Sequence, residues 1–304
     1  LIPLTISEVK SSTIRKQDLP FLRNAILPRY SKTILDSLQF EDRFFKSTAA
    51  PYYGALTQSF EKNNANQLTY QLKVDKANAF KVDFGGFISS RAVNNGFLSL
   101  AYRRVGYIGQ KIEASSYFGK FYGAGKINYE LVSPGRIPLS FSAYLVLNRW
   151  DYFKSFASFY EDVKPSFLIQ EERYLGLQLK CPTGPNSLLA LNTRVFWLDD
   201  FYYQTASFTN KDTADYTAFH GESARLSFTR NTLNRKQFAS SGSLIEVKMS
   251  FVRGNETTLP GSTSISKDSV RNKHQLLSIQ LEFLSFPFQK KQLVKWGIHF
   301  KSVL

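Results

Sequence analysis

The sequence predicts an all-β transmembrane antiparallel barrel, preceded by a small α+β domain. Three observations lead to this prediction. Apolar and polar residues alternate with a period of two from Ala79 onward. The predicted strands are longer than those of most soluble sheets, and the connections between them alternate between short and long.

The composition narrows the class of protein. Of 304 residues, 15% are aromatic and 21% are charged, and a single cysteine excludes an internal disulfide. The chain is therefore too aromatic for a disordered protein and too poor in cysteine for a disulfide scaffold. Its length suits either two domains or one long all-β domain.

The net charge of +15 raises the question of nucleic-acid binding. The basic residues, however, recur singly along strand-like segments and in turns, as at Arg103, Lys248 and Lys295. No basic helical face is present, so no nucleic-acid partner is expected. A solvated or lumenal position explains these charges better.

No segment reaches the roughly 20 apolar residues that a membrane-spanning helix requires. The first residues also lack the basic and apolar regions of a signal peptide. If the chain forms a membrane barrel, we expect an export signal to lie upstream of Leu1.

Residues 1–76 are predicted to form the small α+β domain. Residues 4–9 read as a strand, Asp18 begins a helix, and Ser31 is the expected N-cap of a second helix. Two further strands are expected at residues 54–62 and 67–75. The order β-α-α-β-β resembles a polypeptide-transport-associated (POTRA) repeat, which implies a periplasmic location.

Residues 77–304 are predicted to form the barrel. One side of each strand is apolar and the other is polar or charged, as a lipid-facing surface and a wet lumen require. The apolar positions include Leu98, Leu100, Tyr102, Leu139, Phe141, Ala143, Leu145, Leu147, Leu175, Leu177, Leu179, Ile245, Val247, Met249, Phe251, Leu277, Ile279, Leu281 and Phe283.

The connections test this prediction independently, because bacterial membrane barrels have short periplasmic turns and long extracellular loops. With the strands counted from Phe80, the long connections are 149–170, 199–221 and 254–272, after the fifth, seventh and ninth strands. The short connections are 106–110, 133–138, 181–186 and 286–290, all after even strands. The long loops are therefore expected at one end of the barrel.

The connection after the eighth strand carries the most specific local motif. Arg230, Asn231, Phe238 and Gly242 resemble the periplasmic turn of the bacterial surface-antigen superfamily, which includes the outer-membrane insertase and the two-partner-secretion transporters. This sequence has Ala239 where the superfamily usually has proline. Gly242 suits a position with positive φ at the end of the turn.

Segments 84–91, 147–153 and 164–166 carry a closer resemblance, to the C-terminal barrel of patatin-like phospholipases from Bacteroidetes. Gly85 and Gly86 in the first barrel strand carry this resemblance best, and small residues there suit a weakly packed barrel seam. In that family a patatin hydrolase precedes a POTRA module and the barrel.

The resemblance implies an outer-membrane barrel and a periplasmic module that anchor a hydrolase domain lying upstream, with export of that domain as a further role. The chain contains no Gly-x-Ser-x-Gly element, so we expect no catalytic residue, cofactor or metal in it. The expected partners are membrane lipids, the upstream hydrolase domain and the barrel assembly machinery. Alternatives are polypeptide translocation, insertion of other barrels, a client caught during assembly, and a soluble all-β binding protein.

Other residues that can carry chemistry have simpler explanations. No metal-like spacing joins the histidines, and the paired carboxylates are placed in or beside loops. Cys181 is predicted in a turn and without a partner that would activate it. The aromatic clusters fit an interface girdle. The residues concerned are His220, His274, His299, Glu161, Asp162, Glu171, Glu172, Asp199, Asp200, Trp150, Tyr152, Phe153, Phe201, Tyr202 and Tyr203.

Residues 292–303 are expected to form the eleventh barrel strand. Barrels of the superfamily have 16 strands, so the resemblance implies that five strands are absent from this sequence. Eleven strands would leave the edges at residues 80–91 and 292–303 unpaired in hydrocarbon, where each unsatisfied backbone group costs several kcal/mol. Either the remaining strands belong to the same protein, or a partner supplies strands during assembly.

Overall fold

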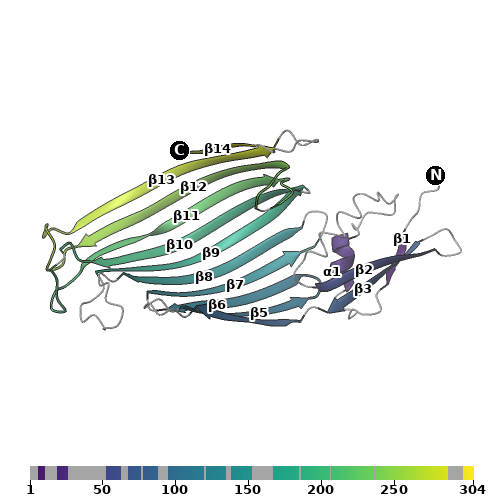
Figure 1. Cartoon of the computed structure of the whole chain (residues 1–304), viewed down its shortest axis with the longest axis horizontal. Helices are drawn as coiled ribbons and strands as arrows, with labels where there is room; N and C mark the ends of the chain where they lie inside the picture. Colours follow the sequence, from purple (N-terminus) through teal and green to yellow (C-terminus); the bar gives the residue numbers. More distant parts are fainter. Residues whose placement is uncertain are drawn as a thin grey trace.

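The computed structural model describes residues 6–10, 19–26, 53–62, 68–76, 78–87, 95–119, 121–134, 138–152, 167–184, 186–205, 207–235, 237–286 and 297–304. These residues form one helix, a three-stranded sheet and an eleven-stranded sheet (Figure 1). Among them, no helix is long and apolar enough to cross a bilayer.

The N-terminal part comprises β1 (Ile6–Lys10), α1 (Leu19–Ile26), β2 (Tyr53–Lys62) and β3 (Leu68–Lys76). The strand order is β1-β3-β2, with β1 parallel and β2 antiparallel to β3. Pro20 lies in the first turn of α1, where its missing N–H costs no helical hydrogen bond. Phe21, Leu22 and Ile26 are buried. The second helix predicted from Ser31 lies outside the described residues.

The large sheet contains eleven strands in sequence order, each antiparallel to the next. They are β4 (Phe80–Phe87), β5 (Asn95–Val105), β6 (Gly109–Gly119), β7 (Tyr122–Ser133), β8 (Leu139–Tyr152), β9 (Leu168–Gly184), β10 (Ser187–Tyr202), β11 (Asp215–Asn231), β12 (Gly242–Leu259), β13 (Val270–Phe286) and β14 (Ile298–Val303). The predicted antiparallel barrel sheet of eleven strands is confirmed.

Several strand boundaries were predicted wrongly. The strands from β9 to β13 have 16 to 18 residues, so the connections between them are shorter than expected. β11 already begins at Asp215 and β12 continues to Leu259, and the two strands pair with each other as far as Tyr216 and Leu259. At the other end of the sequence, β14 is Ile298–Val303, and residues 292–296 of the predicted eleventh strand lie outside the described residues.

The connections fall into two groups at opposite ends of the sheet (Figure 1). One end carries the loop 260–269 and the described residues of the loop 203–214, while the other carries the turn 106–108 and the described residues of the connections 185–186 and 232–241. The three-stranded sheet lies at the second end, where the Arg103 N–H donates to the Ala79 carbonyl at 2.7 Å, beside the start of β4.

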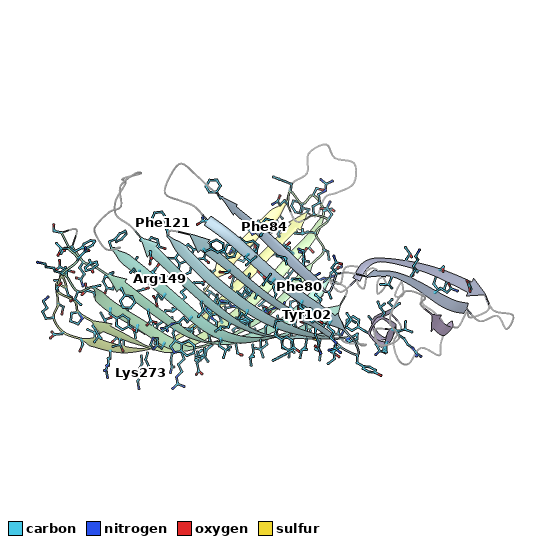
Figure 2. All side chains as sticks on the ribbon, turned by 90° about the horizontal axis from the view of Figure 1, so that it is seen from below. Phe80, Phe84, Tyr102, Phe121, Arg149 and Lys273 are labelled. Carbon is cyan, nitrogen blue, oxygen red and sulfur yellow. The ribbon has the colours of Figure 1, made fainter. Side chains whose placement is uncertain are left out.

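The two faces of the large sheet differ in chemistry. The outward side presents large apolar side chains to the surroundings, and this outward band includes Leu145, Leu147, Leu175, Leu177, Leu179, Leu191, Val195, Leu226, Met249, Phe251, Leu277, Ile279 and Leu281, all at least 36% exposed. A soluble sheet would bury such a face, whereas a lipid-facing wall leaves it uncovered by protein. The sheet curves around the opposite, polar side (Figures 1 and 2).

Candidate functional site on the concave face and at the sheet edges

The concave face contains a cavity of about 690 Å³ that extends across β6 to β12. Hydroxyl, amide, phenol and charged groups dominate its lining. The lining residues are Ser115, Tyr117, Tyr122, Ala124, Gly125, Lys126, Asn128, Glu130, Ser142, Tyr144, Val146, Asn148, Tyr174, Gln178, Lys180, Ala190, Asn192, Arg194, Arg225, Ser227 and Lys248. This is the polar side that the alternation predicts.

Tyr144 spans three strands of this face. Its ring lies over Gly176 of β9, where any Cβ would overlap the phenol. Beyond that strand the Asn192 amide donates to the Tyr144 oxygen at 2.8 Å, and the phenol oxygen lies 3.0 Å from Asn192 Oδ1. The glycine is therefore required for contact between side chains on β8 and β10.

Among the described residues, five cations and one carboxylate line the cavity. Arg194 Nε donates to Ser223 Oγ at 3.0 Å, and its guanidinium lies 5.3 Å from the centre of the Tyr174 ring. Arg225 Nε donates to Ser250 Oγ at 3.0 Å. These bonds orient the guanidinium groups but do not neutralise them.

The end of the concave face nearest the long loops is acidic instead. The Asn148 amide donates to Glu172 at 3.1 Å, and Gln170 donates to Asp200 at 3.3 Å. Each of these carboxylates thus has a neutral hydrogen-bond donor. The charge on this face changes from negative at the loop end to positive in the middle.

The outward side carries a polar cluster near the loop end. The Asp199 carboxylate, whose side chain is 4% exposed, pairs with Arg173 and accepts a hydrogen bond from the Tyr216 phenol at 2.6 Å. His220 Nε2 lies 3.1 Å from the same carboxylate. Side chains from the two strands that flank β10 therefore contact both oxygens of the Asp199 carboxylate, just beyond Trp197. Aromatic and basic groups at this level suit a membrane interface.

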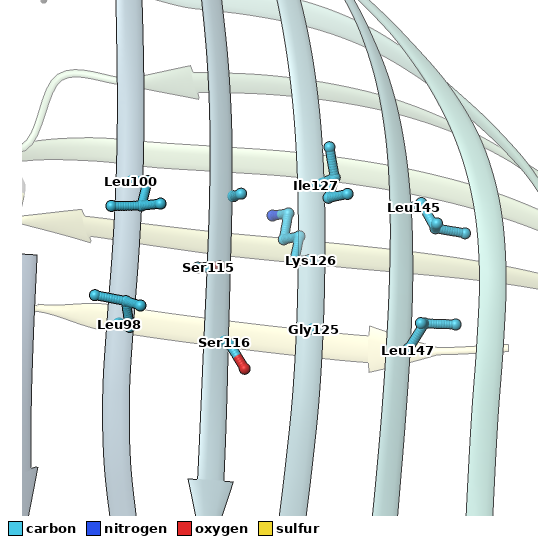
Figure 3. Close-up of a pocket in the computed structure, with 10 residues that line it drawn as sticks. Leu98, Leu100, Ser115, Ser116, Gly125, Lys126, Ile127, Leu145 and Leu147 are labelled. Carbon is cyan, nitrogen blue, oxygen red and sulfur yellow. The ribbon is translucent and has the colours of Figure 1, made fainter. Parts of the chain in front are cut away.

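A shallow apolar pocket of about 200 Å³ lies on the outward side between β5 and β8 (Figure 3). Leu98 of β5 and Leu147 of β8 are on its sides. Ser116 and Gly125 face each other between them, and both lack a large side chain. The outward band therefore has a gap between large side chains at this point.

The described residues of the long loops 203–214 and 260–269 join the two loops to each other. The Thr213 N–H donates to Ser262 Oγ, and the Ser262 N–H donates to the Thr213 carbonyl, each at 3.0 Å. The Gly261 N–H donates to the buried Asp215 carboxylate at 2.6 Å. Tyr203 and Phe208 stack with ring centres 4.2 Å apart, and Phe208 is buried. Together these contacts form a compact cap at one end of the sheet.

Asp212 is the ionised centre of that cap. Its carboxylate accepts hydrogen bonds from the Thr209 N–H at 2.8 Å, the Ser262 hydroxyl at 2.9 Å and the Thr209 hydroxyl at 2.9 Å. In that order these bonds lower the pKa of Asp212 below its ordinary value.

The strands at the two edges of the sheet, β4 and β14, are each paired on one side within the described part of the chain. They are not paired with each other, so these eleven strands do not close into a barrel. On β4, Phe80 is 56% exposed and Phe84 is 85% exposed (Figure 2).

The motif residues selected from the sequence lie in two places. Gly85 and Gly86 are in the edge strand β4, and a Cβ on Gly85 would meet no atom within 4 Å. Arg230 and Asn231 end β11, on one side of the turn 232–241. Within the turn, Phe238 has φ 53° and is 92% exposed, and on the other side of the turn Gly242 begins β12 with φ 93°.

That turn is held by side chains. Asn234 Oδ1 accepts the N–H groups of Ser240 and Ser241 at 3.0 and 3.1 Å, and Thr232 Oγ1 accepts the Ser243 N–H at 2.8 Å. A Cβ on Gly242 would overlap the Thr232 carbonyl. The turn therefore requires glycine at this position for two reasons: the backbone has a positive φ, and there is no space for a Cβ.

The structure places several other residues differently from the sequence analysis. Cys181 lies within β9 opposite Leu189, not in a turn, and His220 lies within β11, not in a loop. Asp199 and Asp200 belong to β10. Among the described residues no group of three or more His, Cys, Asp or Glu side chains could hold a metal ion. Residues 161 and 162 lie outside the described residues.

Sequence reasoning missed the Asp199 cluster and the join between the loops. Both depend on side chains that only strand pairing brings together, such as Arg173 and Tyr216 on the strands either side of β10. One available signal was Asp199 itself, which falls on the outward side two residues beyond Trp197.

No protein-family model matches the chain, and no curated protein matches it in sequence. The fold resembles BamA from Haemophilus ducreyi lacking POTRA domains 1–3, with a TM-score of 0.51 and 12% identity over 93% of this chain and 55% of that one. CdiB from Acinetobacter baumannii gives a TM-score of 0.48 and 10% identity over 99% of this chain and 53% of that one. The chain thus spans about half the length of these structures. The likeness to BamA shows a fold of the outer-membrane barrel type.

Proposed function

We propose that this chain is part of the wall of an outer-membrane β-barrel that anchors a periplasmic module, residues 1–76, and a patatin-like phospholipase domain upstream of it. The observation that best supports the barrel is that one face of the sheet is apolar and the other is polar. Leu175, Leu177 and Leu179 of β9 are 52, 47 and 42% exposed on the outward side, while Gln178 and Lys180 line the concave cavity. A bilayer outside and water inside satisfy both faces.

The arrangement of the connections supports an orientation. The short turns lie at the same end of the sheet as the N-terminal module, and the joined loops lie at the other end (Figure 1). In a bacterial outer membrane the short turns face the periplasm. The module is then periplasmic, and the cap of residues 203–214 and 260–269 is extracellular.

The barrel we propose is completed by strands beyond the eleven in this sheet. The free edges of β4 and β14 would otherwise present unpaired N–H and C=O groups to lipid, at a cost of several kcal/mol each. Strands of the same polypeptide, or of the barrel assembly machinery while the barrel folds, would remove that cost.

The hydrolase part of the proposal rests on the sequence resemblance of residues 84–91, 147–153 and 164–166. It is tested on the whole protein. We expect phospholipase activity that fractionates with the outer membrane and is lost when the serine of an upstream Gly-x-Ser-x-Gly element is replaced by alanine. If no such element precedes residue 1, the hydrolase part of the proposal is wrong and the barrel part stands.

A second candidate function is polypeptide translocation or barrel insertion, and the concave face favours it. The cavity offers many hydrogen-bonding groups to a passing chain, and the free backbone of β4 could pair with another strand. The number of POTRA modules separates the two candidates. Several modules upstream would support polypeptide handling, whereas one module behind a hydrolase would support anchoring.

Extraction from membranes distinguishes the two membrane functions from a third possibility, a soluble all-β binding protein. The outward band predicts that the intact protein stays in the membrane pellet after carbonate washing and needs detergent for extraction. Release without detergent would contradict both membrane functions.

A further inference from the structure

We propose that the concave face binds an acidic stretch of polypeptide at a lumenal basic patch, which we define as Lys126, Lys180, Arg194, Arg225 and Lys248. This inference rests on the proposed barrel, because it takes the concave face to be a lumen. It adds a binding site and a partner class to that function.

The patch is built by strand pairing. β9, β10, β11 and β12 are consecutive in the sheet, and each contributes one cation to the same cavity. Lys180 pairs with Ala190 on β10, Ala190 pairs with Ser227 on β11, and Ser227 pairs with Lys248 on β12. Small side chains therefore separate the cations and leave the space above them open.

Most of the charge in the patch is not neutralised. Lys248 pairs with Glu246 at 2.6 Å. Within the described part of the chain, the other four cations form no ion pair. Glu130, which is the one carboxylate among the described lining residues, accepts a hydrogen bond from the Ser140 hydroxyl at 2.7 Å. Cations gathered in a concave, partly enclosed surface attract anions more strongly than the same charges on a flat surface.

The extent of the patch favours an extended chain over a small anion. From β7 to β12 there are five strand spacings of about 4.8 Å, so the cations spread over roughly 24 Å. A single phosphate or carboxylate cannot reach all of them. An extended peptide advances about 3.4 Å per residue, so a segment of about seven residues spans the patch.

The neutral groups between the cations also suit a polypeptide. Asn128, Gln178 and Asn192 offer both donors and acceptors, which backbone C=O and N–H groups require. The acidic loop end at Glu172 and Asp200 would repel an acidic segment. That repulsion would restrict such a segment to the middle of the lumen.

The test uses the full-length protein in a nonionic detergent. Fluorescence anisotropy measures binding of a labelled peptide of four Glu-Ser-Gly repeats, with four Lys-Ser-Gly repeats as the oppositely charged probe. We expect the acidic peptide alone to bind, and its affinity to fall about tenfold or more between 50 and 500 mM salt, because exposed charge contacts are screened.

Two matched triple variants, which remove the same charge, locate the site. The patch variant is Lys180→Gln with Arg194→Gln and Arg225→Gln, and the outward control is Arg253→Gln with Arg271→Gln and Lys273→Gln. Lys273 points away from the concave face in Figure 2. We expect the patch variant to lose about tenfold in affinity and the control to stay within about twofold.

Equal peptide affinity in the patch variant and the control would overturn the proposal. Displacement of the peptide by tripolyphosphate, added at the same total concentration of negative charge as the peptide, would also overturn it, because it would indicate a small-anion site. If the triple patch variant does not fold, Lys180→Gln alone serves, because that side chain forms no hydrogen bond with the described residues. Heat-dependent migration on a detergent gel monitors the barrel separately. A folded barrel without peptide binding contradicts this inference alone, and failure to form a barrel contradicts the proposed function too.

Discussion

Tyr144 of β8 and Asn192 of β10 are hydrogen bonded to each other across β9, over Gly176 of that strand, where a Cβ would overlap the phenol ring. One side-chain pair thereby links the two strands that flank β9, in addition to the backbone pairing of each with β9.

Gly176→Ala is expected to destabilise the barrel by about 1–3 kcal/mol, because the added methyl group displaces the Tyr144 ring and breaks its bond to Asn192. Urea unfolding in lipid vesicles, followed by tryptophan fluorescence, measures the change. Gly125→Ala is the matched control, since its Cβ would meet no atom within 4 Å. Equal stability of the two variants would show that the ring does not depend on the glycine.

Gly242→Ala is expected to cost about 1–3 kcal/mol, because alanine is strained at φ 93° and would overlap the Thr232 carbonyl. Gly106→Ala, in another turn at the same end of the sheet, has open space for its Cβ and should be nearly neutral. The same urea titration compares them. A neutral Gly242→Ala would mean that the turn 232–241 can rearrange without loss.

The alternation made most of the large sheet predictable. Leu175 to Lys180 alternate so regularly that the face of each residue could be assigned before any pairing was known. Boundaries were harder, since Pro182 suggested a turn near Cys181, yet β9 continues to Gly184. Proline is tolerated near the end of a strand. The patch and the Asp199 cluster were not predictable, because they depend on register between strands.

The join between the two loops should depend on pH through Asp212. A lowered pKa means that the folded state favours the carboxylate, so its stabilising effect is full at neutral pH and is lost as the pH falls below the ordinary value of 3.8. Carbon NMR of the Asp212 carboxyl group should give a midpoint below 3.8. Ser262→Ala should move that midpoint upward, because it removes one donor. A midpoint at or above 3.8 would exclude the proposed hydrogen bonds in solution.

A charge placed on the outward side should be far more costly than one on the concave side. Leu177→Arg is expected to destabilise the barrel in vesicles by about 2–4 kcal/mol, the cost of a basic residue at the lipid-facing midplane. Gln178→Arg, one residue further along β9, should change stability by less than about 1 kcal/mol, because its side chain reaches the cavity. Similar losses at both positions would contradict the assignment of the faces.

The central claim is that the outward band meets lipid and the concave face meets water. A cysteine scan of residues 175 and 177–180 in a Cys181→Ser background tests it most directly, with a fluorophore on each cysteine and the protein in vesicles. Gly176 is left in place because a side chain there would overlap the Tyr144 ring. We predict that brominated lipid tails quench the probe at positions 175, 177 and 179, and that aqueous iodide quenches it at 178 and 180. Equal quenching by iodide at all five positions would contradict the membrane barrel.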